Sequence, residues 1–213
     1  MGENNQLEIT NFKLGIGLPL SFPMVPADFF ESFMLMEKGE YVLLRSKDGP
    51  IDMLRNGLVG LALAAGCTHL VMLDTDMYYD IKTIPKLLSH ERDVVGALYF
   101  RRCPPFEPFM VKNNEYILEW EEGDLIEVDR TAGGCILFNM KVFDKIDPPW
   151  FEVEKTENGM IKLGEDYNFC DKLRNAGYKI YVDTSIVAEH LSAMRVNTRW
   201  FKLWRKLTEE NHK

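Results

Sequence analysis

Two carboxylates spaced one residue apart, Asp74 and Asp76, are the residues of this chain best suited to metal chemistry. Two negative groups this close repel each other unless a positive charge lies beside them, and a divalent cation is the usual partner. Carboxylate oxygens suit Mg²⁺ or Mn²⁺, which also bind phosphate oxygens. The pair therefore predicts a site for a cation and a diphosphate, although a capped turn after a strand would have the same short motif.

The residues before this pair indicate where it lies in the fold. Residues 70–73 are continuously apolar, which is typical of a parallel strand covered on both faces. Open α/β sheets bind their ligands outside the carboxyl ends of such strands. We therefore expect both carboxylates at the carboxyl edge of a central sheet.

Alternating strand and helix patterns surround this strand and predict a doubly wound α/β sheet. Pro19 is expected to stop the first strand, and Asp52 to cap the helix that follows the second. The apolar residues of the first helix, Phe30 and Met34 among them, are expected to pack in the core. Residues 109–128 change to short alternating pieces, which predict antiparallel hairpins. The expected strands cover residues 13–18, 41–45, 70–73, 94–98, 135–138 and 179–182, and the expected helices cover 26–38, 52–65, 81–90 and 165–176.

Composition limits the class of protein. A length of 213 residues is typical of one domain, and 33 acidic against 25 basic residues argue against a general nucleic-acid binder. The four cysteines form no C-x-x-C pair, which favours free, mostly buried thiols. The N-terminus lacks the apolar core of a signal peptide, and no apolar run approaches the ~18 residues that span a membrane. We therefore expect a cytoplasmic protein.

The last segment, residues 195–213, differs from the rest of the chain. It has six basic residues against two acids, and its aromatic residues are spaced to share one helical face. The pattern predicts a basic amphipathic helix. Three roles stay open for it: packing on the domain, pairing with a second subunit, or contact with an anionic membrane surface.

Four further features could carry chemistry, and each also has a purely structural interpretation. Arg55 lies in a first helical turn near the carboxyl edge of the sheet, where it could equally be a solvated residue. Gly133 and Gly134 precede a strand and allow a close backbone approach, or form a simple turn. Glu165 and Asp166 begin a helix, where capping alone would explain them. A single histidine such as His190 is more often structural than a ligand.

Taken together, these residues resemble the nucleotide-sugar domain of glycosyltransferases of the GT-A fold, family 2 type. The resemblance implies a single Rossmann-like GT-A domain over residues 1–194, with a mixed, mostly parallel central sheet, helices on both faces and a small antiparallel hairpin region. It covers roughly residues 14–190. The matching positions, in chain order, are Pro19, Asp48, Arg55-Asn56, Asp74-x-Asp76, Gly133-Gly134, Gly164-Glu165-Asp166 and His190.

The resemblance also implies roles at the metal and the catalytic base. Asp76 and His190 would bind Mn²⁺ or Mg²⁺, and Asp74 would assist them or hold the ribose. The cation would neutralise charge on the departing nucleoside diphosphate. Asp166 would be the general base that takes the proton of the acceptor hydroxyl, which favours inversion of configuration. Retaining enzymes share this fold and metal motif, so retention stays open as the alternative.

The remaining positions would bind the donor. Asp48 matches the position that receives the nucleotide base, and Arg55 matches a basic residue that faces the nucleotide. Gly133 and Gly134 would line the donor-sugar and acceptor pocket, and Pro19 and Glu165 belong to the same donor site. A UDP- or GDP-sugar is the expected donor, and the acceptor is unspecified.

Two other functions remain open from the sequence. A metal-dependent nucleotidyltransferase would be expected to have a glycine-rich, basic loop after its first strand, and residues 18–25 have neither character. A non-catalytic module that binds sugar nucleotides or glycans would be favoured if Asp166 and His190 lay far from Asp76.

The chain departs from the family pattern at one position. Residues 17–21 lack the Thr-Tyr-Asn that often follows the family's proline, so the resemblance does not specify how the nucleotide base is recognised.

Overall fold

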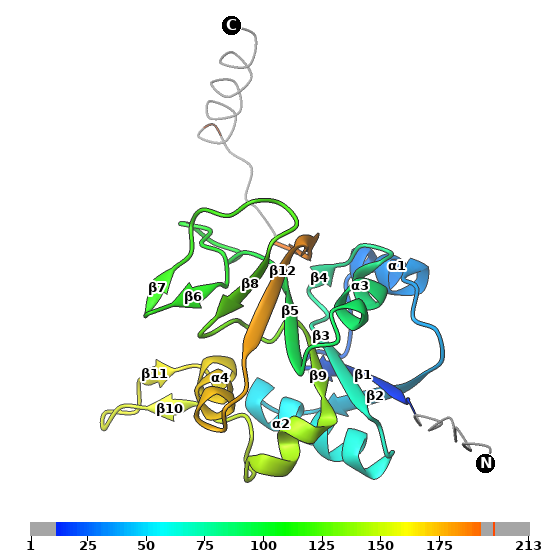
Figure 1. Cartoon of the computed structure of the whole chain (residues 1–213), viewed down its shortest axis with the longest axis horizontal. Coiled ribbons are helices and arrows are strands. Elements are labelled where there is room, and N and C mark those ends of the chain that lie inside the picture. Colours follow the sequence, from blue (N-terminus) through cyan, green and yellow to red (C-terminus); the bar gives the residue numbers. More distant parts are fainter. Residues whose placement is uncertain (1–11, 193–197, 199–213) are drawn as a thin grey trace, which may run out of the picture.

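The computed structural model describes residues 12–192 and residue 198, and it confirms the expected α/β fold (Figure 1). A seven-stranded sheet forms its centre, and five of the strands run in the same direction, while β9 and β8 run antiparallel to their neighbours. The order across the sheet is β2 (Tyr41–Lys47), β1 (Leu14–Leu20), β3 (His69–Leu73), β9 (Cys135–Asn139), β5 (Val94–Leu98), β12 (Ile180–Val187) and β8 (Leu125–Val128).

Helices cover both faces of this sheet, as the sequence predicts. Helices α2 (Ile51–Ala64) and α4 (Glu165–Asn175) and the 3-10 helix η1 (Met140–Lys145) pack on one face. Helices α1 (Ala27–Leu35) and α3 (Thr83–Ser89) pack on the other.

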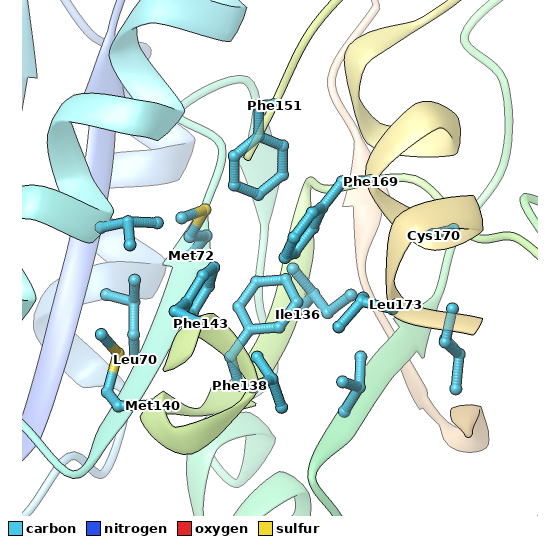
Figure 2. Packing of buried hydrophobic residues seen from close by; sticks show 14 of the residues in the cluster. Leu70, Met72, Ile136, Phe138, Met140, Phe143, Phe151, Phe169, Cys170 and Leu173 are labelled. Atoms are coloured by element: carbon cyan, nitrogen blue, oxygen red, sulfur yellow. The ribbon is translucent and has the colours of Figure 1, made fainter. Parts of the chain in front are cut away.

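The apolar central strands divide between these two cores because successive side chains of a strand point to opposite faces. In β3, Leu70 and Met72 join the core under α2 and α4, while Val71 and Leu73 join the core under α1 and α3. Figure 2 shows the first core, where the ring of Phe169 from α4 stacks against Phe143 with centroids 5.4 Å apart.

Three two-stranded sheets lie outside the central one. The pair β6 (Val111–Lys112) and β7 (Glu115–Tyr116) forms an antiparallel hairpin within the expected stretch 109–128. Strand β8, from the same stretch, joins the edge of the central sheet beside β12. The pair β10 (Glu154–Lys155) and β11 (Ile161–Leu163) precedes α4. The pair β4 (Met77–Tyr78) and β13 (Glu189–His190) joins segments far apart in the sequence.

Two expectations about element ends are wrong. Pro19 lies inside β1, opposite Ser46 of β2. Beyond Gly17, β1 pairs with β2 alone, so a residue without an N–H can stay in the strand. Helix α2 begins at Ile51 with no side-chain cap, so Asp52 lies in the first turn rather than at the cap.

The expectation that the apolar residues of the first helix pack in the core is also partly wrong. Phe29 and Phe33, four residues apart, share its inner face and stack at 5.8 Å. Phe30 and Met34, which are also four residues apart, share the opposite face and are 59% and 62% exposed. A single helix on a sheet buries one stripe, so neighbouring aromatic residues cannot all face the core.

The expected amphipathic helix over 195–213 falls outside the described residues, apart from residue 198, and stays a prediction. The four cysteines are free thiols, and three of them are buried. Within residues 12–192, every helix is too short or too polar to cross a membrane.

Candidate active site

A cavity of about 480 Å³ opens at the carboxyl edge of the sheet, where the sequence places the two carboxylates. Its wall comes from the ends of β1, β3 and β5, the first turns of α2 and α4, and β13. Seven of the ten predicted site residues line it: Pro19, Arg55, Asp74, Asp76, Glu165, Asp166 and His190.

Arg55 holds three carboxylates together at the inner wall of this cavity. Its Nη2 lies 3.1 Å from Asp74 Oδ2, and its Nη1 pairs with Glu165 and lies 3.9 Å from Asp166 Oδ2. These acids come from the end of β3 and the start of α4, so one side chain of α2 ties three elements together. Only 3% of Arg55 is exposed. Its guanidinium therefore binds protein carboxylates at the cavity wall, and its contact with a nucleotide stays a prediction.

Burial and mutual repulsion set the electrostatics of this cluster. Burial raises the pKa of Asp74, and the Arg55 guanidinium only partly opposes this shift. Burial likewise raises the pKa of Glu165 against the effect of Arg55. Burial alone would lower the pKa of Arg55, but the three carboxylates outweigh burial and raise it.

Gly133 and Gly134 form a backbone wall behind these charges instead of lining the cavity itself. A Cβ on Gly133 would lie 2.6 Å from Arg55 Cζ, and one on Gly134 would lie 2.8 Å from the Tyr99 hydroxyl. The N–H of Gly134 donates to that hydroxyl over 2.7 Å, and its carbonyl accepts from the Asp74 N–H over 2.8 Å. The paired glycines are required here because side chains would displace the Arg55 guanidinium and the Tyr99 hydroxyl.

The antiparallel pair of β4 and β13 brings His190 to Asp76. His190 lies opposite Met77, and its Nε2 is 3.5 Å from Asp76 Oδ2. Its Nδ1 lies 3.0 Å from the carbonyl oxygen of Phe100. Because a carbonyl only accepts, Nδ1 carries a proton. The protonated ring faces Asp76 with its Nε2–H, whereas the neutral ring would have a lone pair on Nε2 that can bind a cation.

The same two residues shift each other's protonation. The hydrogen bond with Asp76 raises the pKa of His190 against the effect of burial. Burial works to raise the pKa of Asp76, but His190 and Arg102 outweigh it, so the pKa is lowered.

The donor set at Asp76 fits a divalent cation. A backbone carbonyl that orients a histidine through its other ring nitrogen is the usual support of a metal-binding imidazole. Four carboxylates (Asp74, Asp76, Glu165, Asp166) against two guanidinium groups (Arg55, Arg102) leave an excess of two negative charges. Within the described part of the chain, no three His, Cys, Asp or Glu side chains form a ready metal cluster. Asp76 and His190 therefore fit two ligand positions of a divalent cation, which would need its other ligands from outside the described side chains.

The structure separates one predicted residue from the rest, and two further residues of the cavity wall contact predicted ones: Tyr99 bonds to Gly134 and Arg102 pairs with Asp76. Asp48 is exposed after β2 and does not line the cavity, so its contact with a nucleotide base stays a prediction. Tyr99 and Arg102, which both line it, were not among the predicted site residues. Both follow the strand 94–98 at the same carboxyl edge, and this position was the available signal.

Comparison of the fold with solved structures gives two informative likenesses. A197 from STIV superposes with a TM-score of 0.61 at 20% identity, over 85% of this chain and 87% of that one. GalNAc-T7, crystallised with UDP, GalNAc and Mn²⁺, superposes with a TM-score of 0.55 at 12% identity. The fold is that of a GT-A domain.

This likeness concerns the fold alone, because both identities are low. The alignment with GalNAc-T7 covers 86% of this chain and 44% of that protein. No protein-family model and no curated protein sequence matches this chain.

Proposed function

We propose that this protein is a glycosyltransferase that uses a divalent cation and moves a sugar from a nucleotide-diphospho-sugar to an acceptor hydroxyl. The β4–β13 pair carries this proposal, because it sets His190 against Asp76 in the cavity that also holds Asp166. The presence of UDP, GalNAc and Mn²⁺ in GalNAc-T7, which has a similar fold, supports a donor of this class.

Asp76 and His190 would hold Mn²⁺ or Mg²⁺, and the donor would be a UDP- or GDP-sugar. When bound, the cation neutralises charge on the diphosphate leaving group. Asp74 is held by Arg55 through both carboxylate oxygens, at 3.2 and 3.1 Å. We therefore assign Asp74, on the inner wall of the cavity, to orient the donor or to assist in binding the cation. Asp76 is the acid of the pair that faces the open side of the cavity.

Asp166 is the best candidate for the general base. Glu165 points inward to Arg55 and its side chain is 11% exposed, while the side chain of Asp166 is 22% exposed at the cavity. As the acceptor oxygen bonds to the anomeric carbon, Asp166 takes the hydroxyl proton. The bond from that carbon to the diphosphate oxygen breaks, and the nucleoside diphosphate leaves. A base on the face opposite the leaving group inverts the configuration.

Among the described residues, the arrangement expected of a non-catalytic module is not found. A module that only binds would be indicated by Asp166 and His190 lying away from Asp76, but all three line one cavity.

Replacing the proposed base tests the function. We expect Asp166→Asn to lower release of the nucleoside diphosphate from a UDP- or GDP-sugar with Mn²⁺ by a factor of about 10² or more. Donor affinity should change little, because the substitution keeps the shape of the side chain. Release is measured by coupled assay and affinity by calorimetry. Asp28→Asn is the matched control, since Asp28 lies in the first turn of α1 and is exposed. Turnover by Asp166→Asn equal to that of wild type would exclude Asp166 as the base.

A further inference from the structure

Arg102 shares one carboxylate oxygen with His190. Its Nη2 lies 2.7 Å from Asp76 Oδ2, the same atom that His190 Nε2 approaches to 3.5 Å. A cation bound by Asp76 and His190 would compete with Arg102 for this carboxylate. The guanidinium therefore supplies, in the protein without metal, the positive charge that the cation would bring.

Hydrogen bonds hold the backbone around Arg102 in place, while the side chain of Arg102 is accessible to solvent. The N–H of Arg101 donates to the carbonyl of Glu107 over 3.0 Å, and the Ser192 hydroxyl lies 3.3 Å from the carbonyl of Arg102. The Arg102 side chain is 55% exposed, and that of Asp76 is 35% exposed. An ion pair between groups this exposed is weak, so the guanidinium can leave Asp76 at little cost.

We propose that Arg102 changes partner during donor binding. Without a cation its guanidinium pairs with Asp76, and when a cation binds that carboxylate the guanidinium moves to the diphosphate of the donor. The inference rests on the proposed function and adds a positively charged ligand for the phosphates. Arg102 lines the same cavity as Asp76 and Asp166, so the diphosphate is within the space that its side chain borders.

The chemistry of the guanidinium suits this second position. Its planar fork of donors matches the oxygens of a phosphate, and the contact is a charge-assisted hydrogen bond. Charge on the diphosphate increases as the bond to the sugar breaks, so a guanidinium at this place stabilises the leaving group more in the transition state than in the bound donor. Arg55 cannot take this role because three carboxylates occupy it.

The proposal predicts effects of opposite sign from one substitution. Arg102→Ala removes the group that competes for Asp76, so Mn²⁺ alone should bind about two- to fivefold more tightly. The same variant lacks a phosphate ligand, so UDP or GDP with saturating Mn²⁺ should bind about tenfold more weakly. A residue with only a structural role would not strengthen one ligand and weaken the other.

Arg101→Ala is the matched control. Arg101 is the preceding residue, carries the same charge, pairs with Glu107 and does not line the cavity. Calorimetry of wild type and both variants, with Mn²⁺ alone and then with UDP or GDP added, compares the affinities of the three proteins for the cation and for the nucleotide. We expect Arg101→Ala to match wild type in both titrations.

The outcomes distinguish this inference from the function on which it rests. If wild type binds a nucleotide with Mn²⁺ and Arg102→Ala behaves like Arg101→Ala, the exchange of Arg102 is wrong and the proposed function stands. Loss of affinity for both Mn²⁺ and nucleotide in Arg102→Ala would also overturn the exchange, because it would make Arg102 a support of the site. If wild type binds neither UDP nor GDP with Mn²⁺, the proposed function fails and the exchange fails with it.

Discussion

At the scale of single residues, Gly133 shows how closely the charged cluster is packed. Its missing side chain leaves room for the Arg55 guanidinium, which is fixed by its carboxylate partners. We expect Gly133→Ala to lower the free energy of unfolding by about 1–3 kcal/mol, because the buried guanidinium must shift away from the new Cβ. Urea unfolding measures the change.

Gly60→Ala is the control for this substitution. Gly60 lies within α2, and a Cβ there would meet nothing within 4 Å. Alanine in a helix interior is favoured over glycine by about 0.5–1 kcal/mol, so Gly60→Ala should leave stability unchanged or raise it. Equal stability of Gly133→Ala and wild type would contradict the close contact with Arg55.

The types and order of residues singled out seven residues that line the cavity, but not the partners of these residues. Asp74, Asp76 and Asp166 follow strands or begin helices in a way that the sequence displays. The pairing of Arg55 with Glu165 spans 110 positions and depends on how α2 and α4 pack on one face, which no local pattern encodes. Arg102 carried no signal beyond its place after a strand.

At the scale of elements, the short pair β4–β13 matters more than its four residues suggest. It fixes the chain after β12 against the chain after β3, and the N–H of Leu191 donates to the carbonyl of Asp76 over 2.8 Å. Strands of two residues have no usable periodicity, so the sequence could suggest the role of His190 by resemblance but not show the pairing that brings it to Asp76.

The packing of α3 against β12 depends on a buried carboxylate. His90, directly after α3, lies 2.6 Å from Asp183 Oδ2, and the N–H of Ser185 donates to Oδ1 over 2.7 Å. Burial would raise the pKa of Asp183, but these hydrogen bonds outweigh it and lower the pKa. A lowered carboxyl pKa stabilises the fold above the unfolded-state pKa, and this stability is lost as pH falls through the folded-state pKa.

Asp183→Asn should therefore reduce the free energy of unfolding by about 1–3 kcal/mol near pH 7. The difference from wild type should persist down to about pH 5 and shrink below about pH 4, because wild type then loses the same charge. Urea unfolding of both proteins across this range provides the measurement. A difference that stays constant from pH 6 to pH 3.5 would show that the ionised carboxylate is not the stabilising group.

At the scale of the whole molecule, alternation of strands and helices was enough to predict the architecture. Continuous apolar runs indicated strands buried on both faces, and β3 and β9 divide their side chains between two cores as this requires. The antiparallel insertion of β9 between β3 and β5 could not be predicted, because strand order depends on long-range packing. One fold of this kind can carry different activities, so the architecture by itself names neither a donor nor an acceptor.

The central claim is that Asp76 and His190 bind a cation that in turn holds a nucleoside diphosphate. Calorimetric titration of UDP, GDP, CDP and dTDP, each with Mn²⁺ and with EDTA, tests it most directly. We predict that at least one nucleotide binds only with Mn²⁺, and that Asp76→Asn abolishes this binding. Binding that is equally tight in EDTA, or absent for all four nucleotides under both conditions, would contradict the claim.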